Sequence, residues 1–153
     1  MTILKKNIKF LITLFVLVGL SLYSNFAFSA GGFGGQDEVS LYKSGKKLVL
    51  RAKKLEEKDK VEKAKKLYLK AYDKFEKAYN KDKKNADIIN YLGYTSRKTG
   101  NLEQAETYYL KGLELDSKHL GINEYLGELY VQTNRIELAK QKLEVLKGCN
   151  CEE

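Results

Sequence analysis

"NYLGYTSRKTG", residues 90–100, is followed by "NEYLGELYVQTN", residues 123–134, and the two share Tyr-Leu-Gly at a spacing of 34 residues. Laying 86–119 over 120–153 pairs Gly93 with Gly127 and Ala105 with Ala139. Self-similarity at this period is typical of stacked helix–turn–helix units. The sequence therefore predicts an all-α fold, a right-handed solenoid of about three helical hairpins.

Small and turn-forming residues hold fixed places in the repeat. Gly93 and Ala105 are small at the point where two antiparallel helices of one unit approach closely. Gly100 follows the first helix, and a residue without Cβ permits the left-handed conformation that ends many helices. Asn134 takes the same place in the next unit, and Asn is the usual second choice there.

The segment "ADIINYLGYTSRKTGNLEQAETYYLKGLELDSKH", residues 86–119, resembles the tetratricopeptide repeat family. It matches the family pattern at Leu92, Gly93, Ala105, Tyr109 and the closing "LELD". It departs at Ile89, Gly112 and Ser117, where the family usually has Trp, Ala and Pro. We expect only the departure at Ile89 to affect the packing of the helices. The resemblance implies a non-enzymatic protein whose first helices line a concave groove that holds a peptide or protein partner.

An earlier, degenerate repeat precedes these two. "EEKDKVEKA", residues 56–64, mimics "RKTGNLEQA", residues 97–105, and the two closing Ala residues are 41 positions apart. The extra seven residues are nearly two helical turns, so they preserve the apolar phase and predict a long second helix over 61–80. Ala52 then falls at the helix crossing. The helical domain is predicted over 41–153, with repeats at about 45–85, 86–119 and 120–153, close to the minimum for a stable stack.

The first thirty residues have the pattern of an export signal helix. Lys5, Lys6 and Lys9 precede an apolar run over 10–22, and small residues follow at Ala27, Ser29 and Ala30, which predicts cleavage before Ala30. The alternative is an uncleaved membrane anchor. A flexible Gly-rich joint is predicted over 31–40. We therefore expect an exported, periplasmic protein, or else one anchored in the inner membrane by residues 1–30.

Charge is distributed unevenly along the chain. Residues 41–85 hold 17 Lys and Arg against 7 Asp and Glu, a net +10, whereas 86–153 hold 8 against 11, a net −3. The ordinary interpretation is a Lys-rich solvated helix face; the alternatives are an acidic partner or contact of the basic first hairpin with anionic lipid. Export and the lack of interleaved aromatic residues argue against nucleic acid.

The sequence offers little for catalysis. It has none of the zinc-protease, phosphate-loop or nucleophile-elbow motifs, and we expect its one His, His119, to be a solvated loop residue. No catalytic residue, cofactor or enzyme activity is predicted. Cys149 and Cys151 are separated by one residue, so they could form a strained disulfide, exchange thiols, or bind a soft metal such as Cu(I). A thiol-redox or copper-handling accessory protein is therefore the alternative function.

Carrying the resemblance over by position gives the groove of the predicted scaffold: Lys46, Val49, Lys53, Asn90, Tyr94, Arg97, Lys98, Glu124, Glu128 and Val131. The first helices of the first two hairpins contribute mostly basic or amide groups, and the first helix of the third hairpin contributes acids. This distribution suits a partner of mixed charge. Val49 stands where the family's carboxylate-binding variant needs Lys, so that docking function is not expected. We expect Tyr94 to be an exposed anchor. The last helix, 136–147, has no following helix to cover Leu138, Leu143 and Leu146, which favours either self-association or a frayed, uncovered end.

Overall fold

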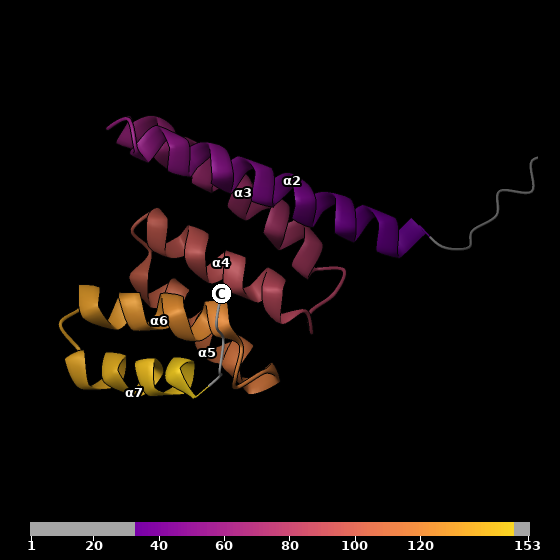
Figure 1. Cartoon of the computed structure of the whole chain (residues 1–153). Coiled ribbons are helices and arrows are strands. Elements are labelled where there is room, and N and C mark those ends of the chain that lie inside the picture. The colour runs from indigo at the N-terminus through magenta and orange to yellow at the C-terminus, as the bar shows by residue number, and fades with distance from the viewer. Residues whose placement is uncertain (1–32, 149–153) are drawn as a thin grey trace, which may run out of the picture. The chain divides into compact units, whose positions relative to one another are not determined.

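The computed structural model describes residues 33–148, which form three antiparallel helical hairpins (Figure 1). The helices are α2 (Phe33–Glu56), α3 (Val61–Tyr79), α4 (Ala86–Lys98), α5 (Leu102–Leu115), α6 (Leu120–Gln132) and α7 (Ile136–Lys147). Within each hairpin the two helices pack on each other, and the hairpins stack through α3 on α4 and α5 on α6, with α4 also touching α6. The all-α, three-hairpin prediction is confirmed. None of these helices is both long and apolar enough to cross a membrane.

The turn inside each hairpin has the same backbone geometry. Asp59, Gly100 and Asn134 have φ of 54°, 96° and 58°, a left-handed region that favours Gly, Asn and Asp. The next residue in each turn donates its backbone N–H to a carbonyl five residues back, as in Lys60 to Leu55 at 2.9 Å and Asn101 to Ser96 at 2.9 Å. This bond is the Schellman closure of a helix end. It confirms the alignment of the degenerate first repeat with the second.

Small residues lie at the helix crossings as predicted. Ala52, Ala64 and Ala105 are fully buried, and a Cβ on Gly93 would lie 2.5 Å from the Tyr109 ring. Ala139 is only partly buried, although it packs against the second core cluster. The crossing is therefore tight in the first two hairpins and looser in the third.

One departure from the family pattern has a packing role that the sequence analysis did not predict. A Cβ on Gly112 would overlap the end of the Ile122 side chain, which comes from α6 of the next hairpin. Both residues are buried. Because Gly112 has no side chain, Ile122 packs into the space that a methyl group would otherwise occupy.

The predicted joint over 31–40 is wrong for its greater part, because α2 begins at Phe33. Gly in a helix interior costs about 1 kcal/mol relative to Ala, and tertiary contacts just after the glycines offset that cost. Leu41 and Tyr42 pack against the first core cluster, and the Asn85 amide donates to Glu38 at 3.4 Å. Residues 1–32, with the predicted signal, lie outside the described residues.

Candidate functional site

A row of tyrosine rings lies along the first helices of the three hairpins. Tyr42 of α2 meets Tyr91 of α4 edge-on with ring centroids 5.7 Å apart, and Tyr94 of α4 meets Tyr125 of α6 at 4.8 Å. Tyr91 and Tyr94 are three residues apart, so they share one side of α4. The rings therefore link α2, α4 and α6. We call the surface formed by these four tyrosines with Lys46, Lys53, Arg97 and Glu128 the inner face.

Three cations lie over these rings. The Lys46 ammonium is 5.3 Å from the Tyr42 centroid and 5.9 Å from that of Tyr91. The Lys53 ammonium is 5.2 Å from the Tyr94 centroid. The Arg97 guanidinium is 5.8 Å from Tyr94 and 6.0 Å from Tyr125. Each such contact contributes about 0.5–1 kcal/mol at an exposed site, so the cations are held in place over the aromatic row.

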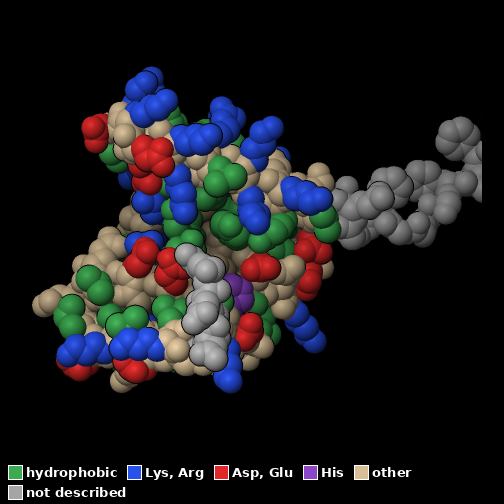
Figure 2. Space-filling view, viewed as in Figure 1, with side chains coloured by type: hydrophobic (Ala, Val, Ile, Leu, Met, Phe, Trp, Pro, Cys, Tyr) green, Lys and Arg blue, Asp and Glu red, His purple; other side chains and the backbone are tan. Residues whose placement is uncertain are grey.

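The phenols of the inner face are neutral around pH 7, because burial raises their pKa. Burial is the largest cause for Tyr42, Tyr91 and Tyr94, and it raises the pKa of Tyr125 to about 12. Arg97 forms an ion pair with Glu128 of α6. The charge left without an ion-pair partner on the described inner face is therefore that of Lys46 and Lys53. Figure 2 shows green side chains, a class that includes Tyr, beside blue Lys and Arg side chains.

Among the predicted groove residues, the structure brings Lys46, Lys53, Arg97 and Glu128 together on the inner face. The expectation that Tyr94 is exposed is wrong, since only 4% of its surface is accessible. Lys53 and Arg97 cover its ring, and Tyr68 packs edge-on against it at 5.9 Å. Tyr94 supports the cations from beneath.

The remaining predicted groove residues lie elsewhere. Val49 is buried in the first core cluster, and Asn90 is buried where α4 meets Gly121 of α6. Lys98 pairs with Glu56 at 2.8 Å, beside the turn of the first hairpin. Val131 and Glu124 line a depression at the C-terminal end of the stack. The ten groove positions carried over from the resemblance therefore include five of the eight residues that define the inner face, and the other five positions lie outside it.

Tyr42, Tyr91 and Tyr125 belong to the inner face but are not among the groove residues predicted from the sequence. A signal for two of them was present, because Tyr91 and Tyr125 recur with Leu-Gly at 34 residues. Both are half-buried, with one edge in the core and the other on the inner face.

His119 is not the solvated loop residue that was expected. Its Nδ1 accepts from the backbone N–H of Ile122 at 3.2 Å and so caps α6. A ring nitrogen that accepts leaves Nε2 as the donor, and Nε2 lies 3.2 Å from an Asp87 carboxylate oxygen of α4. His119 therefore joins two hairpins structurally.

Residues 33–148 contain no group of three or more His, Cys, Asp or Glu placed to hold a metal ion. Cys149 and Cys151 lie outside the described residues, so the structure gives no geometry for the predicted disulfide or copper site.

Comparison with known proteins agrees with this fold. A model of the tetratricopeptide repeat matches residues 86–119. Among solved structures, the first TPR of Spaghetti (RPAP3) bound to the HSP90 peptide SRMEEVD is 15% identical, with a TM-score of 0.54, over 72% of this chain and 85% of that one. The Yersinia enterocolitica type III secretion translocator chaperone SycD is 18% identical, with a TM-score of 0.51, over 72% and 78%. No curated protein matches the chain by sequence.

These identities show the fold alone, and the repeat match supplies the sequence link. The matched segment is the hairpin of α4 and α5, and the hairpins on either side of it share its turn geometry. Residues 86–119 therefore match the tetratricopeptide repeat, and the described chain has the helical-hairpin fold of proteins that contain this repeat.

Proposed function

We propose that the protein is a non-enzymatic scaffold that holds an acidic peptide segment of a partner protein on its inner face. The observation that carries the proposal is the placement of Lys46, Lys53 and Arg97 over two pairs of tyrosine rings, Tyr42 with Tyr91 and Tyr94 with Tyr125. Aromatic and Arg side chains are the residues that most often anchor protein partners. The structural relative solved with the peptide SRMEEVD supports the choice of a peptide over a small molecule.

The charge of the inner face selects an acidic segment over the mixed-charge partner that the sequence suggested. Glu128 is already paired with Arg97, so it does not offer a free acid to a basic partner. Lys46 and Lys53 are exposed on the same helix, seven residues apart. Two turns of helix separate them by roughly 10 Å, a span that an extended acidic peptide of three or four residues covers.

The test compares two variants with the same change of charge. Lys46→Glu/Lys53→Glu reverses the inner face, whereas Lys65→Glu/Lys70→Glu reverses two exposed lysines of α3. Peptides selected from a random library by the wild-type chain are expected to be rich in Asp and Glu. They should bind the inner-face variant at least about tenfold more weakly and the α3 variant almost as well as wild type.

Equal loss in both variants would show that total charge, and not the inner face, governs binding. Selection of apolar or basic peptides would contradict the acidic specificity. Tyr94→Ala is a poor probe, because removing a buried ring leaves a cavity and destabilises the fold.

We further propose that the scaffold works in the periplasm after export through residues 1–30, with cleavage before Ala30. The support is the sequence pattern of that segment. The mass of the chain recovered from its own cells tests the point, because an uncleaved chain would retain the segment and stay with the inner membrane. Contact of the basic first hairpin with anionic lipid is a separate proposal, tested by binding of the chain to anionic vesicles at rising salt.

The thiol or copper alternative concerns Cys149 and Cys151. Replacing both with Ser distinguishes it from the scaffold. Peptide binding is expected to persist in that variant, whereas a redox or copper activity would be lost.

A further inference from the structure

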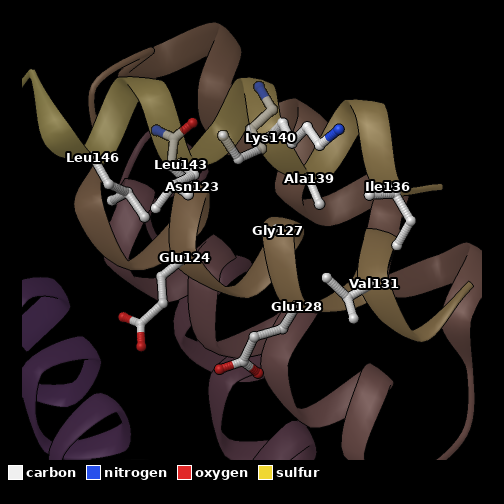
Figure 3. A pocket seen from close by; sticks show the side chains of 11 residues that line it. Asn123, Glu124, Gly127, Glu128, Val131, Ile136, Ala139, Lys140, Leu143 and Leu146 are labelled. Carbon is white, nitrogen blue, oxygen red and sulfur yellow. The ribbon is translucent and has the colours of Figure 1, made fainter. Parts of the chain in front are cut away.

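The C-terminal end of the stack is an apolar depression of about 360 Å³ between α6 and α7. Its floor is Gly127 and Ala139, and its walls include Val131, Ile136, Leu143 and Leu146 (Figure 3). Val131 is 58% exposed and Leu143 is 49% exposed. No residue of α7 is fully buried, whereas α3 has five buried residues. We call this surface the end face.

The same surface is covered in the first two hairpins. Ile88 from the first turn of α4 is fully buried in the core cluster that α2 and α3 form. Ile122 from the first turn of α6 packs against Gly112 of α5. These two residues are equivalent in the 34-residue repeat. Among the described residues, nothing covers α6 and α7 in this way.

The rims of the end face carry opposite charges. Glu124 and Glu128 belong to α6, and Lys140 and Lys142 belong to α7. Glu128 is paired with Arg97 and Lys140 with Glu137, so Glu124 and Lys142 are the rim charges without an ion pair among the described residues. Figure 3 shows the two acids on one side of the depression and Lys140 on the other. Since a Cβ on Gly127 would lie 3.5 Å from the Lys142 Cβ, these residues are level along the antiparallel pair. Glu124 lies three residues before Gly127, so Glu124 and Lys142 differ in height by about one helical turn.

We propose that the end face binds a second copy of this chain. A two-fold axis parallel to α6 and α7 places α6 of one copy across α7 of the other. Apolar walls then meet at the centre, and Glu124 of each copy lies on the same side as Lys142 of its partner. A surface with an unpaired acid on one helix and an unpaired lysine on the other is complementary to itself under that rotation, which favours a second copy over an unrelated helix.

Dimerisation is measured by sedimentation of the chain produced from its full coding sequence. The expected mass is about twice that of the monomer. Leu143→Asp places a charge at the centre of the end face and should yield a monomer with unchanged helix content. The matched control is Leu110→Asp on α5, which is 44% exposed away from the end face and should remain dimeric.

Charge reversal tests the two-fold arrangement without touching the apolar centre. Glu124→Lys or Lys142→Glu alone places like charges on facing sides of the two copies and should weaken dimerisation about tenfold. The double variant restores opposite rims and should recover the wild-type dissociation constant. A wild-type chain that is monomeric at every concentration would overturn the proposal in favour of another protein partner. A dimer that survives Leu143→Asp, or a double variant no tighter than the single ones, would also overturn it.

Discussion

Gly93 and Gly127 hold equivalent places in the second and third hairpins, yet an added methyl group would meet different surroundings at each. At Gly93 it would lie 2.5 and 2.7 Å from two atoms of the fully buried Tyr109 ring. At Gly127 the nearest neighbour would be the Lys142 Cβ at 3.5 Å, an ordinary contact. Substituting Ala at each of the two positions therefore distinguishes the cost of overpacking from the gain in helix propensity.

We expect Gly93→Ala to lower the free energy of unfolding by about 1–3 kcal/mol, because the Tyr109 ring must move within a packed core. Gly127→Ala should raise it by up to about 1 kcal/mol, since Ala costs less backbone entropy than Gly in a helix. Urea unfolding of both variants measures the difference. If both variants changed the free energy of unfolding in the same direction, the third hairpin would not be more loosely packed than the second.

At the same scale, the sequence predicts some residues well and others poorly. Ala64, Ala105 and Gly100 were predicted correctly because their roles follow from local size and backbone conformation. The burial of Tyr94 was not predicted, because it depends on Lys53 of α2 and on Arg97, which folds back over the ring. A linear pattern shows that a tyrosine faces the groove but not that neighbouring cations cover it.

Among the elements, α6 depends at its start on a cap from an unusual residue. The His119 ring accepts the backbone N–H of Ile122 and contacts Asp87 of α4. We expect His119→Ala to lower the free energy of unfolding by about 1 kcal/mol, the usual cost of losing an N-cap. His119→Asn keeps an acceptor at the cap and should recover most of that loss.

Thermal unfolding of the two His119 variants gives the measurement. If Asn proves as destabilising as Ala, the contact with Asp87 and not the cap would be the larger contribution of His119. A loss in neither variant would mean that α6 is held by Ile122 packing alone.

Element ends show why some boundaries were predicted and one was not. The three turns follow from residues that accept a left-handed φ, so sequence alone locates them. The start of α2 cannot be located from sequence alone, because two glycines favour a joint while contacts made by Glu38 and Leu41 favour a helix. Those contacts involve α4 and the first core cluster, which are distant in sequence. Propensity was overridden by tertiary packing.

Across the whole molecule, tyrosine rings connect one hairpin to the next. Phe75 of α3 stacks on Tyr91 of α4 with centroids 4.9 Å apart, and Tyr72 of α3 shares a 2.9 Å hydrogen bond with Tyr108 of α5. Repeat proteins are stabilised by such neighbour interfaces as much as by each unit. Because these interfaces contain phenols, the stability of the stack is linked to their protonation.

Burial raises the pKa of Tyr42, Tyr68 and Tyr108, and raises that of Tyr125 to about 12. A phenol that is a weaker acid in the folded chain than in the unfolded chain stabilises the fold fully below about pH 10, the ordinary Tyr pKa. That contribution is lost as pH rises from about 10 through the folded pKa. We therefore expect alkaline unfolding above pH 10, with helix loss by circular dichroism coinciding with the rise of tyrosinate absorbance.

Lysine deprotonation also begins near pH 10, and it weakens the cations over the rings, so a variant is needed to separate the two effects. Tyr125→Phe keeps the ring against Tyr94 and removes the phenol. It should leave stability at pH 7 nearly unchanged and move the alkaline midpoint upward, because one titrating group that favours the unfolded chain is gone. An unchanged midpoint would assign the alkaline transition to the lysines, and helix loss below pH 10 would contradict the linkage to buried tyrosines altogether.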